Sequence, residues 1–141
     1  MLRGGARPDD AGMLRKASLS FVVAMLSILL SLGAAGARDD EVRREGPCDR
    51  GSEWRLIVRR ESGATLRVRY VLETGDAGRE WSVFLSMNGS RLFAGQRTTN
   101  SDGDLRITRY PADRAGDDLI KGWANNLSNG ESCSGSLTYR F

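Results

Sequence analysis

The sequence predicts an all-β protein: a seven-stranded, antiparallel β-sandwich that follows a cleaved signal peptide. Three observations support this fold class. Beyond Cys48, apolar and polar residues alternate with a period of two, and turn residues interrupt the alternation about every eight to twelve positions. No segment has a convincing helical period. The length of 141 residues accommodates one compact domain and a targeting segment, but not two domains with separate cores.

Residues 1–37 have the composition of a secretory signal. The order is positive, apolar, small, which is the order that the export machinery reads. The three parts are Arg15 with Lys16, the apolar run 21–32, and the small residues Ala35 and Ala37 at the expected cleavage point. We therefore expect a protein that is secreted or held in the cell envelope.

Cleavage after this signal starts the mature chain at Arg38. The alternative is an uncleaved membrane anchor over 17–36, which approaches the length of a membrane span. Cleavage is favoured because serines interrupt the apolar run and its small-residue end is well formed. Polar residues precede Met13, after which the signal has normal proportions, so we expect translation to start at Met13.

The net charge gives little reason to expect a nucleic-acid partner. The whole chain has 21 basic and 18 acidic residues, a net charge of +3, and no histidine. Residues 1–37 contain four of the basic and two of the acidic residues, which leaves a net charge of +1 after cleavage. A nearly neutral domain has no general attraction to polyanions.

The chain contains only two cysteines, Cys48 and Cys133, at opposite ends of the mature domain. In an oxidising compartment two such cysteines most simply pair with each other. We therefore predict a disulfide that closes most of the domain into one loop. A redox or metal-binding role is disfavoured because no second thiol or histidine lies nearby.

The mature chain divides into a charged leader and a folded domain. Residues 38–50 are charged and aperiodic and are expected to be flexible, and residues 51–141 are expected to form the sandwich. The predicted strands are 54–59, 66–72, 81–87, 91–97, 105–110, 119–124 and 133–141. Asn88 and Gly89 predict a tight hairpin between the third and fourth strands, because both tolerate positive φ.

Two features resemble an immunoglobulin-like or fibronectin-type module of small secreted bacterial proteins. Trp81 opens the third strand, and the segment 115–126 has a turn, an aspartate, alternating small and apolar residues, and an asparagine. The resemblance covers 51–141 and implies a sandwich with a tendency toward binding or adhesion. The cysteines depart from the antibody pattern, because Cys48 precedes the first strand and Cys133 lies on the last.

The residues that ordinarily carry catalysis are scarce. Without histidine, the usual general base, nucleophile activator and zinc ligand are missing. The remaining acid/base candidates are Asp102 and Asp118, which sit in or beside turns where aspartate has structural uses. The segment 100–104 has alternating oxygen ligands but departs from a calcium loop, so it is read as a hairpin turn. We expect no enzymatic activity, no cofactor and no metal.

Strand alternation assigns side chains to faces. The strands 54–59, 66–72 and 105–110 are expected to share a sheet whose outer face carries Arg55, Arg59, Arg67, Arg69 and Arg106. The alternatives for this face are contact with an anionic envelope polymer and, as the favoured reading, ordinary solubilisation with Glu61 and Glu73 nearby.

The opposite sheet is expected to contain 81–87, 119–124 and 133–141. Its inner face would carry Trp81, Val83, Leu85 and Met87, with Gly122 and Ala124 leaving room for the Trp81 indole. Its outer face would expose Phe84, Leu119, Lys121 and Trp123 among serines, a platform for a sugar ring or a protein. The alternative is that Trp123 is buried by the other register or by a loop.

Three functions remain open at this stage. The first is a non-enzymatic secreted or cell-envelope binding module, monomeric, whose partner is a protein or an envelope glycan. The second is a secreted protease inhibitor that presents the loop 96–104 or 125–132. An enzyme is third and depends on Asp102 and Asp118.

Overall fold

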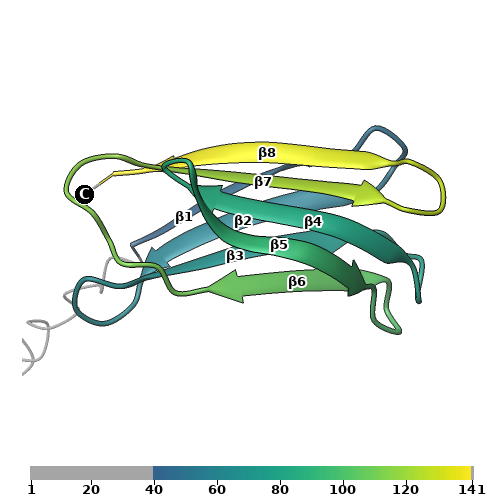
Figure 1. Cartoon of the computed structure of the whole chain (residues 1–141), viewed down its shortest axis with the longest axis horizontal. Coiled ribbons are helices and arrows are strands. Elements are labelled where there is room, and N and C mark those ends of the chain that lie inside the picture. Colours follow the sequence, from purple (N-terminus) through teal and green to yellow (C-terminus); the bar gives the residue numbers. More distant parts are fainter. Residues whose placement is uncertain (1–39, 141) are drawn as a thin grey trace, which may run out of the picture. The chain divides into compact units, whose positions relative to one another are not determined.

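The computed structural model describes residues 40–140, which form two antiparallel four-stranded sheets packed face to face (Figure 1). The first sheet has the order β1-β2-β3-β6 and the second the order β5-β4-β7-β8. The strands are β1 Glu41–Pro47, β2 Glu53–Arg60, β3 Leu66–Glu73, β4 Glu80–Met87, β5 Ser90–Thr98, β6 Asp104–Arg109, β7 Asp118–Asn126 and β8 Ser132–Tyr139. The predicted all-β sandwich is confirmed, including the assignment of strands to sheets. The signal peptide, its cleavage point and the start at Met13 lie outside the described residues.

The prediction of seven strands and a flexible leader over 38–50 was wrong. The described part of the chain has eight strands, because Glu41–Pro47 pairs along its whole length with β2 as an edge strand. Its side chains are almost all exposed, so it has no apolar alternation for a sequence pattern to detect. Backbone hydrogen bonds to β2 and the disulfide that follows it hold this strand in place.

The β4–β5 hairpin forms where the sequence predicts it. Asn88 and Gly89 both have positive φ, 51° and 79°, and Met87 pairs with Ser90 across the turn. The Asn88 side chain also holds the hairpin to β7, since its Nδ2 donates to Asp118 Oδ1 at 2.6 Å and its Oδ1 accepts from the Leu119 amide at 2.8 Å. This contact sets the register in which β7 lies beside β4.

The core lies between the sheets and contains the inward residues that alternation assigns. Leu56, Val58, Leu66, Val68, Tyr70, Leu72, Trp81, Val83, Leu85, Met87, Leu105, Ile107, Ile120 and Ala124 are all buried. The space beside Gly122 was assigned wrongly: a Cβ there would lie 2.8 Å from the ring of Tyr70, so the glycine accommodates that tyrosine rather than Trp81. The Tyr70 hydroxyl crosses the core and donates to the Cys133 carbonyl at 3.2 Å.

One outward residue is also buried. Val71 lies on the outer face of the first sheet but is only 4% exposed, because Arg55 and Arg106 flank it on the neighbouring strands. The aliphatic parts of arginine side chains cover apolar neighbours while their guanidinium groups stay in water. The period-two pattern correctly predicts that the Val71 side chain points outward, but it cannot show that the neighbouring arginines bury it.

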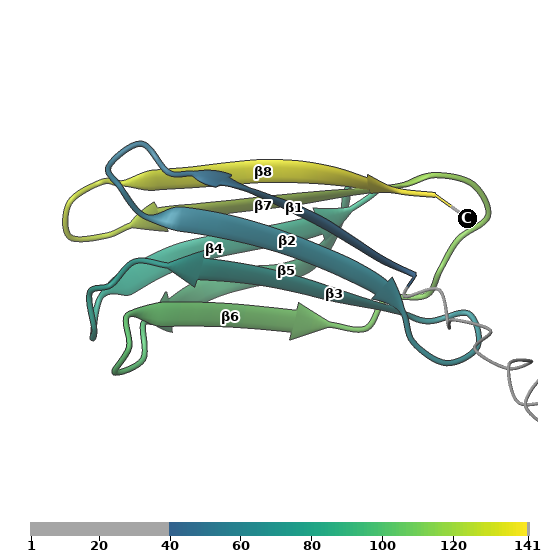
Figure 2. The ribbon, with the colours of Figure 1, turned by 180° about the vertical axis from the view of Figure 1, so that it is seen from behind.

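The predicted disulfide between Cys48 and Cys133 is present and joins the two sheets along one side. Cys48 follows β1 and Cys133 lies in β8, and these edge strands come together at the end of β1 that precedes Cys48 and diverge toward its other end (Figure 2). The Trp54 indole lies between the same two edge strands. Its ring lies against Gly46 of β1 and Gly135 of β8, where a Cβ would overlap it.

The opposite side of the sandwich is closed by an aromatic ring between two arginines. The guanidinium carbons of Arg97 and Arg109 lie 4.6 and 4.8 Å from the centre of the Phe93 ring. Arg109, on β6, also donates from Nε to the Leu92 carbonyl of β5 at 3.2 Å. Arg97 shares β5 with Phe93, so the contacts that connect the two sheets here, where no disulfide does, are the cation–π contact and the hydrogen bond of Arg109.

Candidate functional site

The four residues predicted to form a binding face all lie on the outer surface of the second sheet. Phe84 is 38% exposed, Leu119 39% and Trp123 42%, and Lys121 is exposed as well. Neither a shifted register nor a covering loop buries Trp123. The predicted outward orientation is confirmed, while binding at this face stays a prediction.

We call this surface the aromatic face and define it by the outward residues of its four strands. They are Glu80, Ser82, Phe84 and Ser86 of β4; Arg91, Ala94, Gln96 and Thr98 of β5; Leu119, Lys121, Trp123 and Asn125 of β7; and Ser132, Ser134, Ser136 and Thr138 of β8. Phe84 and Trp123 are opposite each other in the register of β4 and β7, close enough for their side chains to interact. Serines occupy most of the positions around this aromatic pair.

A hollow of about 510 Å³ lies on the aromatic face. It is lined by Phe84, Ser86, Lys121, Gly122, Trp123, Ser134, Gly135 and Ser136. The hollow arises because small serine side chains stand beside much larger aromatic and lysine side chains. Its volume falls within the range of small-molecule sites, about 300–1,000 Å³. Hydroxyl groups and one ammonium group surround an apolar ring surface there.

Three of the four predicted residues line the hollow, and one further cation of the same face, Arg91, was not predicted. Leu119 does not line the hollow; it pairs with Thr138 near the other end of β7. Arg91 was missed because a bulge between Leu85 and Ser86 shifts the register and places Arg91 opposite Ser86. Strict alternation cannot reveal a bulge, since one extra residue reverses the face of everything beyond it.

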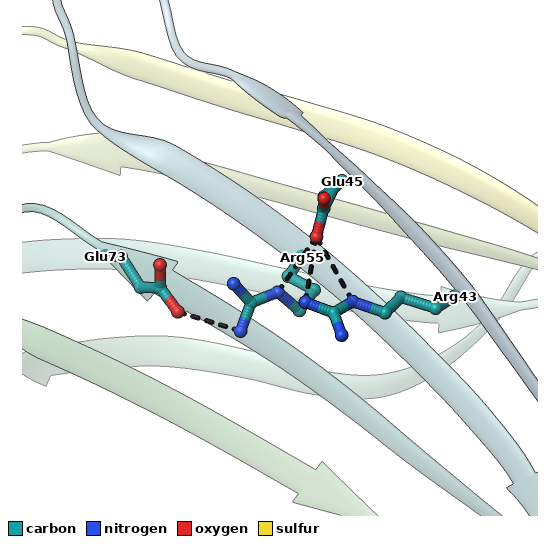
Figure 3. Close-up of polar contacts among 4 residues, drawn as sticks. All are labelled: Arg43, Glu45, Arg55 and Glu73. Carbon is teal, nitrogen blue, oxygen red and sulfur yellow. Dashed lines mark hydrogen bonds and ion pairs between the residues drawn. The ribbon is translucent and has the colours of Figure 1, made fainter.

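The five predicted arginines lie on the outer face of the first sheet, where glutamates pair with three of them. Arg55 binds two carboxylates, Glu45 at 3.2 Å and Glu73 at 2.8 Å, and Figure 3 shows this network together with Arg43. The hydrogen bond from Arg55 and the charge of Arg43 lower the pKa of Glu45. This part of the face is internally neutralised.

Of the four remaining arginines of this face, two lie near a glutamate and two do not. Arg59 and Arg67 both approach Glu61, at 3.3 and 3.7 Å. Among the residues that the structure describes, no carboxylate forms an ion pair with Arg69 or Arg106. Alternating glutamates across the strands support the solubilising interpretation of this surface more than a polyanion site.

The two acid/base candidates have structural contacts. Asp118 is 1% exposed and accepts the hydrogen bond from Asn88 described above. Asp102 donates its amide to Asn100 Oδ1 at 3.0 Å, and Asp104 does the same at 2.8 Å, which forms the predicted turn. Neither Asp102 nor Asp118 lines the hollow, so the two carboxylates are not brought together with the aromatic face.

The loops proposed for protease inhibition are tight turns. In the first, the Gly103 amide donates to the Asn100 carbonyl at 3.1 Å. In the second, the Gly130 amide donates to the Asn126 carbonyl at 2.9 Å, and the buried Glu131 carboxylate accepts from the amide and hydroxyl of Ser52 at 2.8 and 2.9 Å. These contacts explain why the turn residues are present, and they add no support for inhibition, which stays a prediction.

Comparison with known proteins leaves the chain without a family assignment. No protein-family model matches the sequence, and no curated protein sequence matches it. Over residues 40–140, no helix has the length and apolar character needed to cross a membrane. The function must therefore be argued from the aromatic face itself.

Proposed function

We propose that this domain is a non-enzymatic binding module of the cell exterior that holds a glycan on the aromatic face. The finer interpretation of the fold, an immunoglobulin-like or fibronectin-type module, belongs to this proposal and is compatible with the two four-stranded sheets. The buried disulfide supports an oxidising compartment, as expected for a protein that is exported and cleaved after residue 37.

The observation that carries the proposal is the hollow beside Trp123. An exposed indole offers a flat apolar surface to the C–H groups on one side of a sugar ring, and nearby hydroxyls can exchange hydrogen bonds with the ring's own hydroxyls. Ser134 and Ser136 on β8 and Ser86 on β4 stand on either side of the β7 strand that carries the indole. The hollow therefore combines stacking and hydrogen bonding at one place.

A glycan fits this surface better than a protein partner. Stable protein interfaces cover about 800 Å² on each partner around an apolar centre. Here the exposed apolar side chains are a pair of aromatic residues among serines, with Leu119 set apart near one end of the sheet. The residues that line the hollow include no carboxylate or thiol, which supports binding without catalysis.

Binding to immobilised polysaccharides tests the proposal. The panel contains peptidoglycan, cellulose, chitin, a neutral galactan and polygalacturonate, and the variant is Trp123→Ala. We expect at least one glycan to retain the wild-type domain and the variant to lose at least about tenfold in affinity. The melting temperature should stay nearly unchanged, because surface substitutions commonly change stability by less than about 0.5 kcal/mol.

Leu127→Ala is the matched control, because Leu127 is 46% exposed and lies in the β7–β8 turn, away from the hollow. It should bind as the wild type does. The proposal is overturned if no glycan of the panel retains the wild-type domain, if Trp123→Ala binds normally, or if both variants lose binding equally.

A further inference from the structure

The charges of the two outer faces differ in a way that bears on the ligand. The arginine-rich face of the first sheet has glutamates among its cations, as the pairs of Arg55 and Arg59 show. The aromatic face has two cations, Lys121 and Arg91, and one carboxylate among its sixteen defining residues, Glu80, which lies at the opposite end of β4 from Ser86, the residue paired with Lys121. At the end of the aromatic face that carries Lys121, no carboxylate lies opposite the cation on either neighbouring strand, although the domain as a whole is nearly neutral.

Lys121 is the cation placed at the hollow. It is exposed, lines the hollow, and lies between Ser86 of β4 and Ser136 of β8 in the register of the sheet. Within residues 40–140, no carboxylate forms an ion pair with it. An ammonium group surrounded by hydroxyls has its donors available to a ligand.

The spacing between Lys121 and Trp123 matches one sugar unit. The two residues are separated by one position on β7 and point to the same side, so their Cα atoms are about 7 Å apart. A pyranose ring stacked on the indole would therefore bring a substituent at its edge toward the ammonium group. Ser134 and Ser136 on the adjacent strand can donate hydrogen bonds to the same substituent.

We infer that the glycan bound at the hollow is acidic, with a sugar-ring carboxylate held by Lys121 while the ring stacks on Trp123. The inference rests on the proposed function, since it names the ligand class of the same site. A carboxylate only accepts hydrogen bonds, and ammonium and hydroxyl groups can donate them, with charge assistance from the lysine. A carboxylate attached directly to the ring lies at a fixed distance from the stacked ring, and that distance matches the spacing between Trp123 and Lys121. A phosphate in a flexible linker has no fixed distance from the ring, so it would not need this spacing.

Titration calorimetry with defined oligosaccharides tests this inference on the mature domain. The acidic probes are tetramers of galacturonate, mannuronate and hyaluronan, and the neutral probe is the methyl-esterified galacturonate tetramer. The wild type should bind at least one acidic tetramer at least about tenfold more tightly than the neutral one. Lys121→Gln should lose that preference, and Lys121→Arg should retain most of it.

Arg106→Gln is the matched control, because it removes an exposed arginine without an ion pair from the opposite face. It should bind the acidic tetramer as the wild type does. The inference is overturned if no acidic tetramer binds, if Lys121→Gln binds normally, or if Arg106→Gln loses as much affinity as Lys121→Gln. The last result would indicate a general effect of net charge.

The two proposals fail in different ways. Equal binding of acidic and neutral tetramers, still abolished by Trp123→Ala, overturns the acidic ligand and leaves the glycan-binding function in place. Acidic binding that depends on Lys121 and does not change in Trp123→Ala overturns the stacking site and with it the proposed function.

Discussion

The Trp54 indole is wedged between the backbones of two strands from different sheets, and Gly135→Ala should disturb this contact strongly. A Cβ at Gly135 would overlap the ring at Cη2 and Cζ3 and lie 2.5 Å from Cζ2. The ring has little room to move away, because the backbone of Gly46 on β1 lies close to it on the other side. A Cβ added to Gly46 would be only 2.9 Å from Cζ2. The neighbours on both sides are backbone atoms, which move less readily than side-chain ends.

Two limits bracket the cost of this substitution. Overpacking of a filled interior costs about 1–3 kcal/mol. Expelling the ring instead exposes a side chain that buries about 150–250 Å², which corresponds to about 4–6 kcal/mol. Since Trp54 is already partly exposed, the structure can relax toward the lower limit. We expect Gly135→Ala to lower the free energy of unfolding by about 3 kcal/mol.

Urea unfolding followed by circular dichroism measures this effect, and a double-mutant cycle isolates its cause. In a Trp54→Ala background the overlap no longer exists, so Gly135→Ala should become neutral or stabilise by up to about 1 kcal/mol. Ser136→Ala, one residue further on the same strand and outward, is the control and should change stability by less than about 0.5 kcal/mol. An equal cost of Gly135→Ala in both backgrounds would refute the wedge, and so would a cost below about 0.5 kcal/mol.

Three further substitutions probe the contacts that hold the sheets together. Replacing Cys48 and Cys133 with alanine opens a loop with a sequence separation of 85, which should destabilise the domain by about 4–5 kcal/mol in denaturant titrations, and a loss below about 2 kcal/mol would contradict this. Burial raises the pKa of Tyr70, so the folded state keeps a proton that the unfolded state loses above pH 10, and stability should fall there by up to about 1.4 kcal/mol per pH unit. In unfolding curves measured at alkaline pH, Tyr70→Phe should reduce this dependence of the free energy of unfolding on pH by the contribution of one titrating proton. An unchanged slope would show that other groups cause the loss of stability. Asp118→Ala removes the acceptor of the Asn88 amide at 2.6 Å and should cost about 2–3 kcal/mol in thermal unfolding, whereas a cost below about 0.5 kcal/mol would show that the hairpin does not depend on this bond.

Alternation predicted much of the fold because each inner face is buried in one continuous core. Leu66, Val68, Tyr70 and Leu72 point inward in β3 as expected, and Asn88 adopts the positive φ that the hairpin needs. The pattern failed for Glu41–Pro47, which is exposed on nearly every residue and pairs only through its backbone. Backbone pairing leaves no mark on side-chain composition.

The candidate site was predictable in its orientation but not in its extent. Outward positions of Phe84, Lys121 and Trp123 follow from the inward positions of their neighbours, because side chains alternate along a strand. The hollow depends on which residues lie opposite each other on four strands, and register between distant strands is a tertiary property. The bulge that places Arg91 opposite Ser86 is likewise a property of strand pairing that the sequence pattern does not show.

The sequence by itself determined the strand periods, the two opposed inner faces and the pairing of the only two cysteines, because burial and an oxidising compartment constrain each of these directly. Only the tertiary structure decided that glutamates neutralise part of the arginine-rich face and that no carboxylate lies beside Lys121 on the aromatic face. Cross-strand neighbours are fixed by sheet register, and residues such as Arg55 and Glu73 meet across strands although they are distant in sequence. The contrast between the two outer faces, on which the proposed ligand depends, is therefore a property of the folded chain.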